Sequence, residues 1–242
     1  MRTLVVLPTY DEAENIDEVL RRVRAAVPDA TILVVDDRSP DGTADIAEAL
    51  SGELGPVEVL RRAKKSGLGS AYREGFRLGI DRGFEALVEM DSGLSHDPAA
   101  LPSLLAPLDE EPDIGLVVGS RYIPGGSIPH WSWHRRKLSE WGNRYASLML
   151  GLRVRDSTSG FRAYRADAVA KLDLEHIRAD GYGFQIEMAY VIANSGWRVV
   201  ERPIAFVDRV RGTSKMSSRI VVEALRLVTW WSFRDRVLKR RR

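Results

Sequence analysis

The sequence predicts an α/β protein built on a mainly parallel sheet that is flanked by helices. Two observations lead to this fold class. Short apolar runs without polar alternation recur along the chain, and such runs are typical of strands buried on both faces of a sheet. Segments with apolar residues at helical spacing separate these runs, and the β-α alternation predicts a doubly wound sheet with right-handed crossovers. The 242 residues suffice for one large domain.

Five runs are expected to form the strands of this sheet. They are rich in β-branched and other apolar residues, as buried parallel strands are. They cover residues 3–7, 31–35, 57–60, 86–90 and 116–118.

Helical patterns follow the first four strands. The first covers residues 11–27, where Ile16, Val19, Leu20 and Val23 form one apolar stripe. The second runs to Leu50 and has Asp41 or Thr43 as its candidate cap. Two more helices are expected at residues 69–80 and 98–108.

The second half of the chain is less regular, and it lacks a Pro/Ser-rich linker, a repeat and a low-complexity segment. Helices are expected at residues 137–150, 184–193 and 217–238, and a strand at 198–207. The first of these helices carries Leu138, Trp141, Tyr145 and Leu148 on one side. The last carries its apolar residues on one face: Ile220, Val221, Ala224, Leu225, Val228 and Trp231. A single domain over residues 1–225 with an elaborated C-terminal half is therefore expected.

The amino-acid composition limits the possible class of protein and the kinds of site it can contain. Hydrophobic residues make up 44% and charged residues 29% of the chain, ordinary values for a soluble protein. The absence of cysteine excludes a disulfide framework and a thiolate zinc site, and fits a reducing cytoplasm. No run reaches the roughly 18 apolar residues that span a bilayer, and the N-terminus lacks the features of a signal peptide.

Charge is unevenly distributed along the chain. The net charge is +2, yet residues 226–242 hold seven basic residues and one acid. This segment also contains Trp230 and Trp231, and tryptophans beside a basic cluster are typical of helices at a membrane surface. Alternatively, a tryptophan packs in the core and the arginines are merely solvated. Residues 226–242 are therefore expected to be a basic, Trp-containing helix or tail that contacts a membrane surface.

Polar, mostly acidic loops follow four of the predicted strands. They cover residues 8–12, 36–43, 91–93 and 119–122. In open α/β sheets, ligands bind beyond the carboxyl ends of the strands, so these loops predict a shared site. Carboxylates there accept hydrogen bonds from a ribose or a base, as in dinucleotide-binding folds.

Several common sites are excluded. The first strand is not followed by G-x-G-x-x-G, and the chain has no P-loop and no G-x-S-x-G. The four histidines do not have metal-ligand spacing.

The motifs resemble those of a known family. They are LPTYDE at 7–12, DDRSPDGT at 36–43, GLGSAY at 67–72, EMD at 89–91, LSHDP at 94–98, GSRY at 119–122, TSGFRAY at 158–164 and SKM at 214–216. In this order they resemble polyprenol-phosphate mannose synthases (dolichol-phosphate mannosyltransferases), inverting GT-A-type enzymes of glycosyltransferase family 2. The resemblance covers about residues 3–220. It implies GDP-mannose as donor, a polyprenyl phosphate as acceptor and a divalent metal, Mg²⁺ or Mn²⁺.

The resemblance also implies site residues, carried over by matched position. Pro8, Tyr10, Glu12, Val35 and Asp37 are expected to hold the guanosine. Asp91, Ser92 and Gly93 are expected beside the diphosphate, with Asp91 as the metal ligand. Arg121, Arg209 and Lys215 are expected to contact phosphates and sugar, and with Asp91 they form the expected catalytic set. Arg135 and Arg136, after two tryptophans, are candidate ligands of the acceptor phosphate. Asp156 is expected to orient an arginine or contact mannose, or else to cap its own turn.

One position departs from the family pattern. The strand before the metal normally ends in Asp-x-Asp, and here Gly93 replaces the second aspartate. Mg²⁺ can still be held by one carboxylate together with substrate phosphates and water. The loss of one charged ligand is nevertheless expected to weaken metal binding.

Three functions follow as hypotheses. The first is synthesis of polyprenyl-phosphate mannose from GDP-mannose, on the cytoplasmic, inner face of a membrane. The second is a sister transferase that uses another nucleotide sugar with the same lipid. The third is a weakened nucleotide-sugar-binding subunit, which Gly93 suggests. An integral membrane protein is a further expected partner, and nucleic acid is not.

Overall fold

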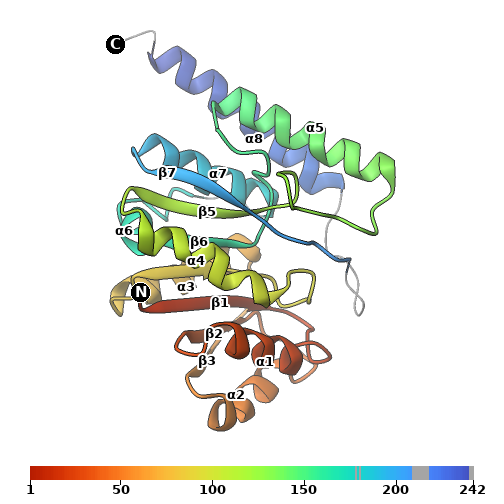
Figure 1. The fold of residues 1–242 in the computed structure, drawn as a ribbon, viewed down its shortest axis with the longest axis vertical. Coiled ribbons are helices and arrows are strands. Elements are labelled where there is room, and N and C mark those ends of the chain that lie inside the picture. Colours follow the sequence, from red (N-terminus) through yellow and green to blue (C-terminus); the bar gives the residue numbers. More distant parts are fainter. Residues whose placement is uncertain (178, 180, 209–217, 240–242) are drawn as a thin grey trace.

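A seven-stranded sheet with helices on both faces forms the centre of the protein (Figure 1). The computed structural model describes residues 1–177, 179, 181–208 and 218–239. The strand order is β3-β2-β1-β4-β6-β5-β7. The strands are β1 (Thr3–Thr9), β2 (Thr31–Asp36), β3 (Val57–Arg61), β4 (Ala86–Glu89), β5 (Ile114–Ser120), β6 (Arg162–Arg165) and β7 (Arg198–Pro203). The predicted α/β class is confirmed.

The sheet is mixed rather than fully parallel. Strand β6 runs antiparallel between β4 and β5, with Ala163 opposite both Val88 and Val117. The sequence analysis missed this strand, because its four residues, Arg-Ala-Tyr-Arg, do not form an apolar run. Arg162 is nevertheless fully buried, since its guanidinium donates to three backbone carbonyls. The other strands of the first half occur where the apolar runs predict them.

The expected helices occur, with differences at their ends, and one further short helix, Ala166–Ala170, was not expected. They are α1 (Ile16–Ala26), α2 (Thr43–Leu54), α3 (Leu68–Asp81), α4 (Leu101–Glu110), α5 (Trp133–Leu150), α6 (Ala166–Ala170), α7 (Tyr182–Asn194) and α8 (Ser218–Lys239), with a 3₁₀ turn η1 (Pro98–Ala100). Helix α1 begins later than predicted, because Asp11 and Ala13 donate backbone hydrogen bonds to the loop after β2 instead. Neither candidate caps α2 at the N-cap position, which is Gly42 at φ 83°.

The two faces of the sheet bury separate apolar clusters. Alternate residues of β1 point to opposite faces, so Leu4 and Val6 join one cluster and Val5 and Leu7 the other. Helices α1 and α4 cover the second face. Helices α3, α7 and α8 cover the first, and Trp231 of α8 stacks on Tyr190 of α7.

Helices α5 and α8 lie together at the end of the molecule remote from α2 and β3 (Figure 1). The Tyr145 hydroxyl of α5 meets the Thr229 hydroxyl of α8 at 2.8 Å. Ala224, Val228 and Trp231 are buried, as the predicted apolar face of the last helix requires. The expected boundary at residue 226 falls inside α8. Within the described residues, no helix has both the length and the apolar character to span a membrane.

Candidate active site

A cavity of about 640 Å³ lies where the four polar loops converge. Pro8, Tyr10 and Glu12 line it from the loop after β1, and Asp37 from the loop after β2. Asp91 and Ser92 follow β4, and Arg121 follows β5. The predicted site at the carboxyl ends of the strands therefore exists as one connected space.

The loops after β1 and β2 are held by each other. Asp36 accepts a hydrogen bond from the Thr9 hydroxyl at 2.9 Å and from the Ser39 amide at 2.8 Å. The Glu12 amide donates to the Thr43 hydroxyl at 3.0 Å. The Glu12 carboxylate is buried and accepts from Asn15 at 2.9 Å. These contacts fix the polar side chains before any ligand arrives.

One end of the cavity combines an aromatic ring, a carboxylate and a cation. The Lys65 ammonium lies 3.6 Å from the centre of the Tyr10 ring. Asp37 is buried, pairs with Arg62 and accepts from the Ser66 amide at 3.2 Å. A carboxylate oxygen has two lone pairs, so Asp37 retains capacity for a donor on a ligand. This end suits a flat, hydrogen-bonding group such as a base.

Asp91 lines the cavity directly beyond β4, the central strand of the sheet. It is half-buried, and no described residue donates a hydrogen bond to its carboxylate. A Cβ on Gly160 would lie 3.9 Å from Asp91 Oδ1 and 3.7 Å from Glu89 Oε1. Glu89 is fully buried behind it, where burial raises the pKa of this carboxyl despite hydrogen bonds from Tyr164 and Gln185. Asp91 is thus the carboxylate that remains available to a ligand here.

The residues around Asp91 fit a divalent cation with oxygen ligands only in part. Among the described residues, no three His, Asp or Glu side chains gather as a complete metal site. However, Gln185 also lines the cavity, is 3% exposed, and its Oε1 has no hydrogen-bond partner. One carboxylate and an unpartnered amide oxygen fit Mg²⁺, which commonly takes its remaining ligands from phosphates and water.

Gly93 is buried but is not among the residues that line the cavity. It is also absent from the glycines with positive φ, whereas its neighbour Leu94 adopts φ 56°. Glycine is therefore not required at position 93 by a left-handed backbone.

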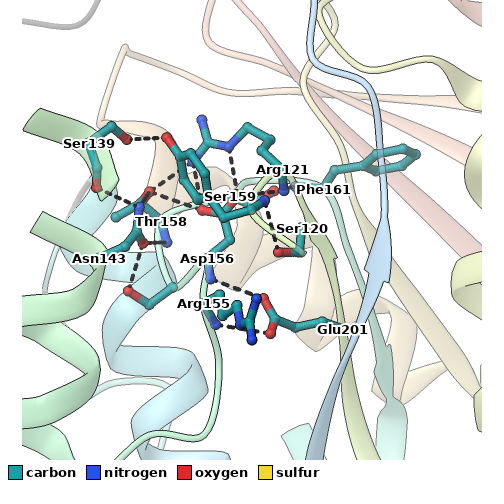
Figure 2. A network of polar contacts seen from close by, with 12 residues as sticks. Ser120, Arg121, Ser139, Asn143, Arg155, Asp156, Thr158, Ser159, Phe161 and Glu201 are labelled. Carbon is teal, nitrogen blue, oxygen red and sulfur yellow. Dashed lines mark hydrogen bonds and ion pairs between the residues drawn. The ribbon is translucent and has the colours of Figure 1, made fainter. Parts of the chain in front are cut away.

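Arg121, which lines the cavity, forms a buried ion pair with Asp156 (Figure 2). Nε and Nη2 of Arg121 each donate to one Asp156 oxygen at 2.7 Å, and Nη2 also donates to Thr158 at 3.0 Å. Burial alone would raise the pKa of Asp156, but the Arg121 guanidinium outweighs it, so the pKa of this carboxyl is lowered. Of the alternatives for Asp156, orientation of an arginine is the one observed.

The segment that carries Asp156 is itself held from two sides (Figure 2). The amides of Arg155 and Asp156 donate to the Glu201 carboxylate of β7 at 2.9 and 3.0 Å. On the other side, Asn143 of α5 accepts from the Thr158 amide at 3.1 Å. The TSGF segment is therefore tied to both the sheet and α5.

The part of the cavity wall near the start of α5 is aromatic and charged. Arg135 lies 3.9 Å from the Trp131 ring and pairs with Asp208 at 3.1 Å. The Trp131 indole donates to the same aspartate at 2.9 Å. Arg136 is exposed, pairs with Glu140 and does not line the cavity. Only one of the two candidate acceptor-phosphate arginines therefore lies at the cavity.

The structure brings most of the predicted residues together. Val35 is fully buried in the core and, like Gly93 and Arg136, does not line the cavity. Arg209 and Lys215 lie outside the described residues. The predicted residues that line the cavity are Pro8, Tyr10, Glu12, Asp37, Asp91, Ser92, Arg121 and Arg135.

Some cavity residues carried no sequence signal of their own. Lys65 precedes the GLGSAY motif, which could have pointed to it. The others reach the cavity through packing of α7 and of the segment after β7: Tyr182, Gln185, Phe206 and Asp208.

Comparisons with known proteins agree on a family. The family model "Glycosyl transferase family 2" matches residues 4–173. Undecaprenyl-phosphate mannosyltransferase of Micrococcus luteus is 48% identical over 98% of this chain and 96% of its own length. Polyprenol monophosphomannose synthase of Mycolicibacterium smegmatis is 45% identical over 98% and 89%. Dolichol-phosphate mannosyltransferase of Pyrococcus furiosus is 36% identical over 99% and 67%.

Solved structures agree on the fold. Glucosyl-3-phosphoglycerate synthase of Mycobacterium tuberculosis, in complex with Mn²⁺, UDP-glucose and phosphoglyceric acid, superposes with a TM-score of 0.68. The match covers 96% of this chain and 79% of that one, at 19% identity. At this identity the similarity concerns the fold alone.

Proposed function

The chain belongs to glycosyltransferase family 2, and from this premise we propose that it transfers mannose from GDP-mannose to a polyprenyl phosphate. It is a glycosyltransferase with the GT-A-type fold. The observation that carries the proposal is the order of the cavity residues along the sheet: Tyr10 and Asp37 follow β1 and β2 on one side, Asp91 follows the central β4, and Arg121 and Arg135 come after β5 on the other side. This order matches the order of base, diphosphate and acceptor phosphate in the reaction.

The Tyr10 end of the cavity is assigned to the guanosine. Tyr10 offers a ring face, and Asp37 and Glu12 offer carboxylates to base and ribose donors. Pro8 and Val35 are assigned to the same subsite by resemblance. Val35 is the partner of Pro8 in the β1–β2 pairing and lies in the core rather than at the cavity surface. Ser92 and Gly93 are assigned to the diphosphate, where Ser92 is fixed by its hydroxyl bond to the Pro8 carbonyl at 2.9 Å.

Asp91 is assigned as the protein ligand of a divalent metal, Mg²⁺ or Mn²⁺, with the Gln185 amide oxygen as a neighbouring donor. Such an ion, when bound, neutralises charge on a diphosphate leaving group. No described residue donates a hydrogen bond to the Asp91 carboxylate, so Asp91 can bind a metal ion without losing an existing contact.

The acceptor needs positioning more than activation. A phosphate monoester has its second pKa near 6, so at neutral pH it is largely a dianion and needs little help from a general base. Arg135 at the rim is assigned to hold it, through the charge-assisted hydrogen bonds that a guanidinium makes with phosphate. Attack from the side opposite the leaving diphosphate would invert the anomeric carbon, which is the stereochemistry we propose.

Arg121, Arg209 and Lys215 are assigned to the phosphates and the sugar. Two guanidinium nitrogens of Arg121 are committed to Asp156 and Thr158, but no described residue accepts a hydrogen bond from Nη1. Fixed cationic donors of this kind stabilise developing negative charge by a few kcal/mol each. Arg209 and Lys215 are assigned by resemblance alone.

The lipid acceptor implies work at a membrane. We assign the chain to the cytoplasmic, inner face, as a peripheral protein whose basic segment 226–242 contributes to the contact. An integral membrane protein is a further candidate partner.

Donor choice tests the proposal. Purified protein is incubated with polyprenyl phosphate, Mg²⁺ and radiolabelled GDP-mannose, UDP-glucose or UDP-N-acetylglucosamine, and the labelled lipid is counted. Label from GDP-mannose alone, lost with EDTA, is the expected result. Label only from a UDP-sugar would instead identify the sister transferase. Tight GDP-mannose binding without transfer at any metal concentration would identify the weakened subunit that Gly93 suggests.

A further inference from the structure

Gly160, in the TSGF segment that lines the cavity, is a glycine that the fold itself does not require. It is not among the glycines with positive φ, so the left-handed freedom of glycine is not used here. A Cβ at this position would meet no atom closer than 3.6 Å beyond its chain neighbours. Gly75 of α3 differs, because a Cβ there would lie 2.6 Å from the Val6 side chain. The missing side chain at Gly160 therefore leaves space on the cavity wall that the protein itself does not fill.

Polar atoms from two other segments border this space. The ideal Cβ position lies 3.6 Å from Gln185 Nε2, 3.7 Å from Glu89 Oε1 and 3.9 Å from Asp91 Oδ1. Asp91 and Gln185 line the cavity, whereas Glu89 is fully buried behind them. We call the space between Gly160, Asp91 and Gln185 the Gly160 notch. A ligand group that packs against the bare Cα of Gly160 can therefore reach a carboxylate and an amide at once.

Glu89 sets the orientation of the Gln185 amide. Nε2 of Gln185 donates to Glu89 Oε1 at 2.7 Å, and the Tyr164 hydroxyl donates to Glu89 Oε2 at 2.6 Å. Glu89 accepts in both contacts, so the nitrogen of the Gln185 amide faces it and the oxygen does not. Within the described residues, the second Nε2 hydrogen and the Oε1 atom of Gln185 have no partner. Gln185 can therefore donate one hydrogen bond to a ligand as well as accept from one.

Arg162 holds the walls of the Gly160 notch together. Its Nη1 donates to the Gln185 carbonyl at 2.6 Å. Its Nε and Nη2 donate to the carbonyls of Ser159 and Ser157 at 2.6 and 2.7 Å. The guanidinium therefore joins the start of α7 to the TSGF segment, and it is fully buried. Because charge-assisted hydrogen bonds of this kind are strong, the notch is formed before any ligand enters it.

A hydroxyl group complements the Gly160 notch. An ionised Asp91 offers only acceptor oxygens, and Gln185 offers an N–H beside it. A hydroxyl both donates and accepts, whereas a phosphate oxygen in direct contact would place negative charge against the Asp91 carboxylate. We propose that the Gly160 notch binds a hydroxyl of the donor sugar, which donates to Asp91 and accepts from Gln185. Glu89 positions the Gln185 amide for this contact. The inference rests on the proposed function, and a water on the bound metal is the other source of the same chemistry.

Calorimetry of GDP-mannose and of GDP, each with Mg²⁺ and without acceptor, tests the notch. Gly160→Ala places a methyl group in it at ordinary contact distances, so the variant should unfold at the wild-type temperature. Its affinity for GDP-mannose should fall at least about tenfold, because the excluded hydroxyl loses its hydrogen bonds. Its affinity for GDP, which has no sugar to place, should not change. The control Gly52→Ala, on an exposed position of α2 with nothing within 4 Å of the added Cβ, should bind both ligands as wild type does.

The contrary results are distinct. Wild-type affinity of Gly160→Ala for GDP-mannose would overturn the notch as a sugar subsite. An equal loss of affinity for GDP and GDP-mannose would overturn it too, and would assign the notch to water on the metal. A wild type that binds UDP-glucose in place of GDP-mannose counts against the proposed donor. The same comparison with UDP-glucose and UDP then decides the notch.

The role of Glu89 is tested through Gln185. Gln185→Leu removes the amide and should weaken GDP-mannose binding as Gly160→Ala does. Glu89→Gln keeps the size of the side chain but lets the Gln185 amide turn either way, so it should weaken GDP-mannose binding by about fivefold and leave GDP binding unchanged. In the Gln185→Leu background, where no amide is left to orient, Glu89→Gln should have no further effect. A loss that adds fully to that of Gln185→Leu, or that reduces GDP binding equally, would contradict a positioning role. Gly160→Ala and Gln185→Leu decide the notch whether or not Glu89→Gln folds.

Discussion

Arg121 shows why a residue matched by motif needs its structural surroundings before it is tested. It is 5% exposed and pairs with a fully buried carboxylate, Asp156. Removing it leaves Asp156 unpaired in the interior, a change that costs about 3–5 kcal/mol in comparable buried pairs. Loss of activity in Arg121→Ala would therefore mix a loss of catalysis with a loss of stability.

Asp156→Asn isolates the charge of this pair. The pKa of Asp156 is lowered from its ordinary 3.8, so the folded protein binds this proton more weakly than the unfolded chain does. The stabilisation is therefore present above pH 3.8 and is lost as pH falls through the lower, folded pKa. At neutral pH the variant should be about 3–5 kcal/mol less stable in urea unfolding, and the difference should shrink below pH 4, roughly.

The exposed pair of Asp113 with Arg198 supplies the control. Asp113→Asn should hardly change the unfolding midpoint, because solvent screens an exposed pair. A difference between wild type and Asp156→Asn that does not change with pH would mean that Asp156 is not a lowered-pKa carboxylate.

Gly93 tests the metal assignment at Asp91. Its φ is not positive, so an aspartate there meets no backbone obstacle of the left-handed kind. Gly93→Asp should lower the Mg²⁺ concentration for half-maximal GDP binding by about tenfold, as an added charged ligand does. Asp91→Ala should abolish turnover and the metal dependence of GDP binding. Calorimetry of GDP binding against Mg²⁺ measures the first effect without relying on turnover.

Two results would contradict this account. Harmless Asp91→Ala would place the metal elsewhere. An inactive wild type whose transfer is restored by Gly93→Asp would make the natural chain a disabled form.

At the scale of elements, the sequence predicts what periodicity encodes. Buried parallel strands appear as apolar runs, and the loops after them converge because their carboxyl ends share one edge of the sheet. The apolar pattern does not predict strand β6, because Arg162 is buried through hydrogen bonds to three backbone carbonyls, one of them from a distant segment. Gln185 and Tyr182 are not predicted as site residues either, because only tertiary packing brings the start of α7 into the same cavity as Asp91.

The amphipathic pattern of helix α8 leaves two interpretations of its tryptophans open: contact with a membrane surface, or packing in the core. Both tryptophans suit a membrane surface, yet Trp231 is 5% exposed and Trp230 is 56% exposed. The core interpretation therefore holds for Trp231, whereas the exposed Trp230 is available for a surface contact. This difference predicts opposite behaviour for two neighbouring substitutions.

Trp231→Ala should destabilise the protein by about 3–5 kcal/mol, because it leaves a cavity against Tyr190. Trp230→Ala should stay within about 0.5 kcal/mol of wild type and weaken vesicle binding instead. Urea unfolding and flotation of the two variants measure this. Equal destabilisation by both would contradict the separation of buried and outward faces on α8.

At the scale of the whole molecule, the fold keeps the proposed nucleotide subsite apart from the proposed lipid contact. Strands β1 and β2 deliver acidic loops to one side of the cavity and the central β4 delivers Asp91, while α5 and the segment after β7 line another part of its wall. Arg226 and Arg234 are exposed on α8, which lies beside α5 (Figure 1). Raising the salt concentration should therefore weaken vesicle binding while leaving GDP binding through Tyr10 and Asp37 less affected.

The most direct test of the central claim is identification of the product. Purified wild-type protein is given GDP-mannose, polyprenyl phosphate and Mg²⁺, and the lipid fraction is analysed by mass spectrometry and by NMR of the anomeric carbon. The account predicts a polyprenyl-phosphate mannose with the β configuration, inverted from the α-linked donor, and none from Asp91→Ala. A retained α configuration, or a lipid product without mannose, would contradict it.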